Sequence, residues 1–265
     1  MIYLGSPGRM VGLKCPVSQR DAAEEGYRFV TTLEGRRKAQ VVPGQRRVWD
    51  LSTGSVTTPT EVATLREFAS GAWGPGPFWF VPEAAPQVNL LSPHDVFDAP
   101  PQQAGGPMRL EDGSWAAFSK RATREGAAIL WRNLGLESDP PVLPGVPVTV
   151  SAYVEGTGAS VMLQWFDRSG AYVGERSSGS VTAAVGTRLS VTATPPVEAA
   201  YVRVSARNAT RAARPAVTWT DRVMPWGEGL GCPKAVVNQT SHELVRAIPG
   251  TPVLSDLNFT VTEVG

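Results

Sequence analysis

The sequence predicts a mainly β protein in which one β module interrupts another. Short alternating segments separated by turn residues recur along the 265-residue chain, which contains 27 Gly and 23 Pro. That composition is typical of many short strands joined by turns. The closing strand-like segment, 258–264, has no expected partner nearby in sequence, and an unpaired strand leaves backbone groups unsatisfied. We therefore expect it to pair with N-terminal strands, so that 1–87 and 233–265 form an outer module around an insert at 88–232.

The outer module is expected to begin with an irregular arm up to residue 26 and to continue as an antiparallel meander. The predicted strands are 27–33, 36–42 and 45–51, with Gly-containing turns between them. Segment 77–81 is expected to extend the same small sheet. This module is predicted to be a small β-sandwich or barrel that carries one helix.

The helix has clear start signals. Thr58 can act as N-cap, Pro59 suits the first helical position, and Glu61 can complete a capping box. An apolar stripe follows and should face the sheet, and a Ser-Gly pair should end the helix. The stripe consists of Val62, Leu65, Phe68 and Ala69.

Strand patterns dominate the insert. Residues 148–154 and 160–167 alternate between apolar and polar side chains, and a Gly-containing turn follows the second segment. Further strands are predicted at 115–118, 128–131, 171–173, 189–193, 201–206 and 216–220. About eight strands at this spacing favour a jelly-roll β-sandwich. Trp165 and Trp219 fall in phase with apolar neighbours and are expected in its core.

Basic residues gather on two neighbouring segments of the outer module. They are Arg36, Arg37, Lys38, Arg46 and Arg47. One interpretation is a charged sheet edge that discourages strand-to-strand aggregation. Another is a subunit contact, in which arginines pair with acidic groups of a neighbouring copy such as Glu61 or Glu67. A nucleic-acid patch is a weaker third alternative, because no aromatic side chains interleave with the cluster.

The outer module resembles the N-terminal domain of phage minor tail proteins. The resemblance is carried by the Tyr-x-Phe-x-Thr-x-Leu strand at 27–33, Arg-Arg-x-Trp-x-Leu at 46–51, Thr-Pro-x-Glu at 58–61, Gly-Pro-Phe-x-Phe at 76–80 and the closing strand 259–265. It is similar to the distal-tail type of long-tailed actinobacterial phages. The resemblance implies a virion structural protein of the tail tip, made in the host cytoplasm, that forms a homo-oligomeric, hexameric ring. It would contact the tail tube, the tape-measure protein and the tail hub.

The insert resembles carbohydrate-binding modules of the galactose-binding-like jelly-roll group. The residues that carry this resemblance are Asn89-Leu90-Leu91, the strand 145–154, Leu163-Gln164-Trp165-Phe166-Asp167, the segment 200–204 and Trp219-Thr220-Asp221. It implies peripheral arms that contact a host cell-wall glycan. The alternative function is a carbohydrate-binding adhesin without a ring role.

Sugar recognition needs aromatic faces ringed by hydrogen-bonding side chains. The aromatic candidates are Tyr153, Trp131, Tyr172 and Trp115, and the polar candidates are Gln164, Arg132 and Asp167. Tyr153 is the preferred residue, because it lies on the polar face of its strand. Asp221 and Asp112 could contribute to a calcium site, but without a compact acidic loop we predict no metal.

No catalytic motif is present, so we predict that the protein is not an enzyme and has no cofactor. His94 and His242 stand apart, and no nucleophile elbow, phosphate loop or dinucleotide fingerprint occurs. The net charge of +1 argues against nucleic acid or an anionic membrane as main partner, and no segment approaches a membrane span. Cys15 and Cys232 are either two buried thiols or a link between the modules.

Overall fold

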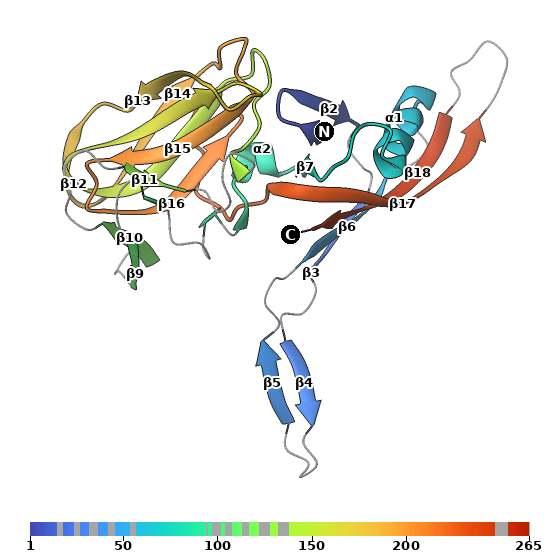
Figure 1. Ribbon diagram of the computed structural model, residues 1–265, viewed down its shortest axis with the longest axis horizontal. Helices are drawn as coiled ribbons and strands as arrows, with labels where there is room; N and C mark the ends of the chain where they lie inside the picture. Colours follow the sequence, from blue (N-terminus) through green and yellow to red (C-terminus); the bar gives the residue numbers. More distant parts are fainter. Residues whose placement is uncertain are drawn as a thin grey trace. The chain divides into compact units, whose positions relative to one another are not determined.

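The computed structural model describes residues 1–14, 18–23, 27–31, 37–41, 46–53, 57–93, 95–96, 102–103, 108–112, 117–121, 128–131, 138–246 and 254–264 (Figure 1). The chain forms two compact units. The first, which we call the split unit, comprises Met1–Ile2, Gly12–Phe78 and Lys234–Gly265, and the second, the sandwich unit, comprises Tyr3–Val11 and Trp79–Pro233. The mainly β fold class is as predicted, while the domain boundaries 1–87 with 233–265 and 88–232 stay a prediction.

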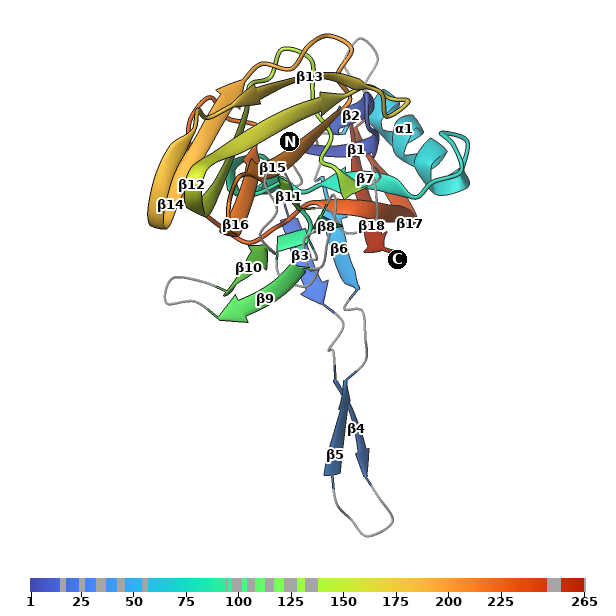
Figure 2. The ribbon, with the colours of Figure 1, turned by 60° about the vertical axis from the view of Figure 1, so that its left-hand side comes forward.

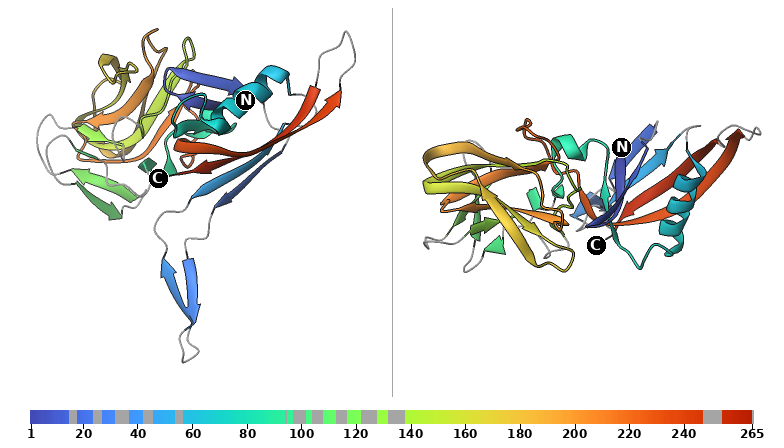
Figure 3. Two further views of the ribbon diagram at one scale, coloured as in Figure 1. Left: turned by 45° about the vertical axis from the view of Figure 1, so that its right-hand side comes forward. Right: turned by 90° about the horizontal axis from the view of Figure 1, so that it is seen from above.

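The split unit joins the two ends of the chain in one antiparallel sheet. Its neighbouring strands are, in order, β17 (Cys232–Arg246), β18 (Leu254–Glu263), β6 (Arg47–Ser52) and β3 (Ser18–Ala23) (Figure 3). Val261 lies opposite Val237 on one side and Trp49 on the other. The expected pairing of the closing strand with the N-terminal strands is therefore confirmed. The expectation that it has no partner nearby in sequence is wrong, because β17 precedes it directly.

Helix α1 (Pro59–Ser70) begins and ends where the sequence predicts. The Glu61 carboxylate accepts hydrogen bonds from the Thr58 backbone N–H at 2.9 Å and the Thr58 hydroxyl at 2.8 Å. Burial would raise the pKa of Glu61, but these bonds, together with Lys14, hold it below the usual value. The buried stripe of α1, which lies against β18, is Val62, Leu65 and Phe68. Ala69 was expected in the stripe but is exposed.

The N-terminal residues are more regular than expected. β1 (Ile2–Ser6) and β2 (Arg9–Leu13) form a hairpin around Pro7-Gly8, where Gly8 has φ of 73°, and β1 pairs with β7 (Phe78–Val81). Pro-Gly is an ordinary turn signal, which the missing apolar alternation concealed. The predicted meander is correct only in its first pair, β4 (Tyr27–Thr31) with β5 (Arg37–Val41). In the described part of the chain β6 pairs with β3 and β18 instead of continuing from β5.

The sandwich unit is a β-sandwich whose layers share the long strand β12 (Val148–Phe166) (Figure 2). One layer contains β8 (Gln102–Gln103), β11 (Ala128–Leu130), β15 (Tyr201–Arg207), the second half of β12 and β13 (Tyr172–Ser177). The other contains β14 (Val181–Ala193), the first half of β12, β16 (Arg211–Thr218), β10 (Ala117–Arg121) and β9 (Met108–Asp112).

The predicted strands 148–154 and 160–167 are thus one continuous strand, whose pairing changes from one layer to the other between Ala159 and Ser160. The pairing register shifts on both sides of Gly156, whose φ is 147°. A Cβ atom there would lie 2.5 Å from the Asn208 carbonyl oxygen. Only glycine tolerates both the dihedral and the close approach, so Gly156 allows an irregularity within the strand instead of ending it.

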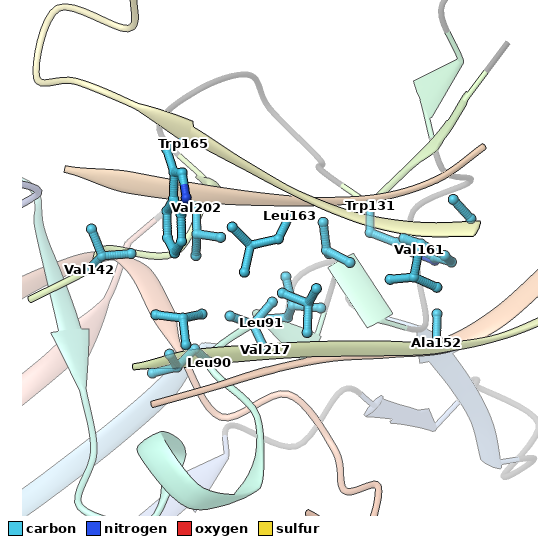
Figure 4. Close-up of a cluster of buried hydrophobic side chains, with 14 of the residues drawn as sticks. Leu90, Leu91, Trp131, Val142, Ala152, Val161, Leu163, Trp165, Val202 and Val217 are labelled. Carbon is cyan, nitrogen blue, oxygen red and sulfur yellow. The ribbon is translucent and has the colours of Figure 1, made fainter. Parts of the chain in front are cut away.

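The core lies between the two layers (Figure 4). Trp165 and Trp219 are core residues, as predicted, with 2% and 9% exposed area. The Trp219 indole N–H donates to the Pro141 carbonyl at 3.1 Å, and its ring meets Tyr3 edge-on at 5.1 Å. These contacts give the indole both apolar packing and the hydrogen bond that a buried tryptophan needs.

The buried amide of Asn89 holds three segments of the sandwich unit together. Asn89 directly follows α2 (Ala85–Val88), and its Nδ2 donates to the carbonyls of Pro215 at 2.9 Å and Gly227 at 3.3 Å. Its Oδ1 accepts from the backbone N–H groups of Leu91 at 3.2 Å and Val217 at 3.0 Å. Every hydrogen-bonding position of this side chain is therefore used.

Candidate functional site

Strand alternation decides which side chains of the sandwich unit can meet a ligand. In the second half of β12, Leu163 and Trp165 enter the core, so Gln164 between them belongs to the outer face. In the neighbouring strand β15, Val202, Val204 and Ala206 are in the core, which leaves Arg203 and Arg207 on that same outer face. Gln164 lies opposite Arg203 on one side and Glu175 of β13 on the other.

The outer face of this layer carries a connected polar and aromatic cluster, which we call the glutamate face: Gln164, Tyr172, Glu175 and Arg207. The Gln164 amide donates to Glu175 Oε2 at 3.2 Å. Arg207 reaches the same carboxylate with Nη2 at 3.0 Å and Nη1 at 3.4 Å from the two oxygens. Two strands separated by β12 are thereby joined through side chains alone.

Tyr172 is the exposed aromatic residue of the glutamate face, with 55% of its area accessible. Partial burial raises the pKa of its phenol, and the charge of Glu175 and a hydrogen bond to that carboxylate act in the same direction, while Arg207 opposes them. The neutral phenol is thus favoured next to Glu175. An exposed ring beside a carboxylate, an amide and a guanidinium is the kind of surface that can stack on a sugar and bond its hydroxyls.

A buried ion pair lies beside the glutamate face, on the same side of the layer. The Asp139 carboxylate accepts from Arg203 Nη2 at 2.7 Å and Nε at 3.0 Å, and the two side chains are only 1% and 12% exposed. The Arg203 guanidinium also lies 4.1 Å from the centre of the Phe166 ring. Phe166 in turn meets Tyr172 edge-on at 5.9 Å. The position of Tyr172 is therefore fixed through a chain of packed groups.

Tyr153 occupies the outer face of the other layer, as predicted, and is half-buried. It lies opposite Arg188 of β14, whose guanidinium carbon is 5.8 Å from the centre of the tyrosine ring. The Arg214 guanidinium lies 6.0 Å from the same ring and 5.2 Å from the ring of Trp226. We call Tyr153, Arg188, Arg214 and Trp226 the arginine face.

The remaining predicted sugar contacts do not join either face. Trp131 is 4% exposed and belongs to the core, which corrects its assignment as an exposed platform. It lies two residues after the buried Ile129, and such spacing puts both side chains on one side of an extended segment. Asp167 stabilises a turn, since its Oδ1 accepts from the Ser169 N–H at 2.8 Å and the Ala171 N–H at 2.9 Å. Trp115 and Arg132 lie outside the described residues.

The basic cluster of the split unit is only partly described. Arg47 forms a two-pronged ion pair with Glu263, with Nε–Oε2 and Nη2–Oε1 distances of 2.9 and 3.0 Å. Its charge is thus neutralised within the chain, and its assignment to a subunit contact stays a prediction. Arg46 is exposed, Arg36 lies outside the described residues, and the side chains of Arg37 and Lys38 in β5 do as well.

A groove of about 510 Å³ lies on the sheet of the split unit. Its lining includes Ser18, Arg20, Asp50, Asn258 and Thr260. The Thr260 hydroxyl donates to Asp50 Oδ1 at 2.9 Å, which joins neighbouring strands β18 and β6. Nothing in this lining concentrates charge or aromatic area, so the two faces of the sandwich unit are the better candidates for binding.

Five members of these faces were not predicted from the sequence: Glu175, Arg207, Arg188, Arg214 and Trp226. Arg207 could have been predicted from the sequence, because the alternation of β15 gives it an outward position. The assignment of the others to a face depends on which strands pair and in which register. Local sequence patterns do not predict this pairing. Arg214 also depends on a bulge, since the register between β12 and β16 shifts between Ser151 and Tyr153.

The described residues show no arrangement of three His, Cys, Asp or Glu side chains suited to a metal ion. None of the helices in this part of the chain is long and apolar enough to span a membrane. Cys232 is fully buried, whereas Cys15 and His94 lie outside the described residues. The alternatives for Cys15 and Cys232 therefore both stay open.

No family model matches the sequence, and no curated protein matches it. Among solved structures, the chain is similar to endo-1,4-β-D-xylanase 10B of Clostridium thermocellum, determined as its CBM22-1–GH10 modules with xylohexaose. The identity is 16% over 50% of this chain and 27% of that one, with a TM-score of 0.30. A chain of infectious bursal disease virus, Gx strain, is 9% identical over 99% of this chain and 55% of that one, with a TM-score of 0.22. The chain thus spans about a quarter of the first structure and about half of the second.

Proposed function

We propose that this protein is a structural component of the tail tip of a long-tailed phage and that its sandwich unit contacts glycans on the host surface. It acts by binding, and it is not an enzyme. The proposal has two parts, assembly by the split unit and recognition by the sandwich unit, and each can fail without the other.

Support for the assembly part comes from the two-piece sheet of the split unit. The last strand, β18, pairs with the N-terminal strand β6, and this pairing supports the resemblance of the two ends of the chain to one distal-tail domain. The ion pair between Arg47 and Glu263 joins the same two ends of the chain. A module closed in this way can carry an inserted sandwich without interrupting its own sheet. Its expected partners are copies of itself in a hexameric ring, the tail tube, the tape-measure protein and the tail hub.

The assembly part is tested by the oligomeric state of the purified chain, alone and with neighbouring tail proteins. Native mass spectrometry and negative-stain microscopy should show closed rings, because ring-forming subunits use a head-to-tail contact that closes on itself. Arg46→Glu reverses a charge on the exposed part of the basic cluster, and Arg66→Glu does so on the exposed side of α1 as a matched control. A chain that stays monomeric under all these conditions and in the assembled particle would refute the ring.

The observation that carries the recognition part is the exposed ring of Tyr172 beside Glu175, Gln164 and Arg207. A sugar ring stacked on Tyr172 would place its hydroxyls within reach of both acceptor and donor groups. Tyr172→Ala should therefore abolish retention of the protein on host cell-wall polysaccharide. Val197→Ala is the matched control, because Val197 is 86% exposed and lies outside the glutamate face. Equal retention of the two variants and the wild type would remove the glutamate face as the contact.

A further inference from the structure

The arginine face differs from its surroundings because its arginines have no acidic partner in the described part of the chain. Arg188 donates from Nη2 to the Ser151 hydroxyl at 3.0 Å and to the Met224 carbonyl at 2.6 Å, both uncharged groups. Its Nε–H is enclosed and has no hydrogen-bond partner among the described residues. Arg214 is exposed and stacks against Tyr153 and Trp226.

Other arginines of the same unit are neutralised. Arg203 pairs with Asp139 at 2.7 Å, Arg207 with Glu175 at 3.0 Å and Arg211 with Glu155 at 3.2 Å. Arg211 and Glu155 belong to the same layer as the arginine face, so ion pairs between arginines and carboxylates occur in that layer as well. Two guanidinium groups around one tyrosine ring, with no carboxylate bonded to either among the described residues, leave a concentrated positive charge and unused N–H donors.

The backbone at Arg214 is strained in a way that keeps its side chain on this face. Its φ is 51°, a left-handed conformation that is unfavourable for a residue with a long side chain. The strain coincides with the register shift between β12 and β16. Non-glycine residues held in such conformations gather at functional sites, where the side chain is needed at that position.

We propose that the arginine face binds the carboxylate or phosphate group of an anionic saccharide. Guanidinium groups bind carboxylate and phosphate oxygens through paired, charge-assisted hydrogen bonds. The edges of Tyr153 and Trp226 add apolar surface for the ring that carries the charge. That the anionic group belongs to a saccharide rests on the proposed function. The anion site itself is inferred from the two arginines alone.

The test uses the full-length protein and observes the indole N–H of Trp226 by NMR, since this group donates to the Pro215 carbonyl inside the face. The probes are glucuronate, glucose 6-phosphate, inorganic phosphate and neutral glucose, and Trp226→Phe identifies the signal. We expect glucuronate or glucose 6-phosphate to shift it, glucose to leave it unchanged, and the affinity to fall with added salt. Absence of any shift with all three anionic probes would overturn the proposal.

Arg214→Gly is the decisive variant, because glycine adopts φ of 51° without strain. It should fold with a melting temperature equal to or above that of the wild type and bind the anionic sugar roughly tenfold more weakly, the effect of losing a charge-assisted hydrogen bond. Arg176→Ala, which removes another exposed positive charge of the unit, should bind like the wild type. Unchanged binding by Arg214→Gly would overturn the site.

The outcomes also distinguish recognition of the saccharide from binding of its anionic group. Inorganic phosphate that binds as tightly as both anionic sugars would overturn the saccharide and leave an anion site. Retention on host polysaccharide that survives Arg214→Gly but is lost in Tyr172→Ala would place the main glycan contact on the glutamate face. Failure of ring formation would affect neither result, so the proposed tail-tip role and the anion site fail independently.

Discussion

The two outer faces of the sandwich unit use the same residue types for different purposes. On the glutamate face Arg207 is paired with Glu175, and beside it Arg203 is paired with Asp139. On the arginine face Arg188 and Arg214 surround Tyr153 with no described carboxylate. The first arrangement fixes side chains in place, while the second leaves charge available for a ligand. The difference shows that the number of arginines on a sheet says little about binding until their partners are known.

Breaking the buried ion pair should have the largest effect. Asp139→Ala leaves the Arg203 guanidinium uncompensated in a site where it is only 12% exposed. The expected loss in the free energy of unfolding is about 3–5 kcal/mol, measured by urea denaturation. Replacing both partners, as in Asp139→Ala with Arg203→Leu, should recover much of the loss, because no buried charge then remains. A loss below about 1 kcal/mol for Asp139→Ala, the range of exposed pairs, would contradict the role of this pair.

The arginine face should depend instead on the uncharged amide of Asn89. Its hydrogen bonds to the Pro215 and Gly227 carbonyls hold the segments that carry Arg214 and Trp226. Asn89→Ala removes four hydrogen bonds, each with a net contribution of about 0.5–1.5 kcal/mol, so we expect a total loss of about 3 kcal/mol in the free energy of unfolding. The same variant should displace the NMR signal of the Trp226 indole.

Asn89→Asp is the matched variant for this comparison. It keeps the size of the side chain but turns a carboxylate toward two carbonyl oxygens, and it should destabilise the protein at neutral pH at least as much as Asn89→Ala. Recovery of stability at low pH would follow, because the protonated acid can donate one hydrogen bond. Full stability of both variants at neutral pH would contradict the supporting role of Asn89.

Local signals explain what the sequence could predict. The capping box Thr58, Pro59 and Glu61 defines the start of α1 without help from the rest of the chain, and alternation correctly placed Trp165 in the core and Tyr153 outside it. In contrast, β3 has the mainly polar sequence Ser-Gln-Arg-Asp-Ala-Ala and gains its regularity by pairing with β6, from which β4 and β5 separate it in the chain. Such pairing depends on backbone hydrogen bonds, which any residue type can form and which residue types therefore predict poorly.

The candidate sites show the same limit at the level of single residues. Gln164 and Tyr172 could be predicted as outward residues, but their common partner Glu175 depends on the register between β12 and β13. Arg214 depends on a bulge and a left-handed backbone, neither of which arginine favours. Functional groups of this kind are the ones that sequence patterns are least able to reveal, because they violate the local preferences on which those patterns rest.

The smallest expected effect concerns the charge of Glu175 on the glutamate face. Because burial, the carboxylate and its hydrogen bond raise the pKa of Tyr172, Glu175→Gln should lower that pKa toward its ordinary value. The folded state favours the neutral phenol, so this stabilisation is present below about pH 10, the usual tyrosine pKa, and is lost as the pH rises through the folded-state pKa. Alkaline absorbance titration, with Tyr172→Phe as the reference, measures the shift.

The free energy of unfolding of Glu175→Gln at neutral pH should change by less than about 1 kcal/mol, because the Arg207–Glu175 pair is partly exposed. An unchanged pKa of Tyr172 would mean that the Glu175 carboxylate does not act on the phenol. Tyr172 would then not be coupled to the other residues of the glutamate face.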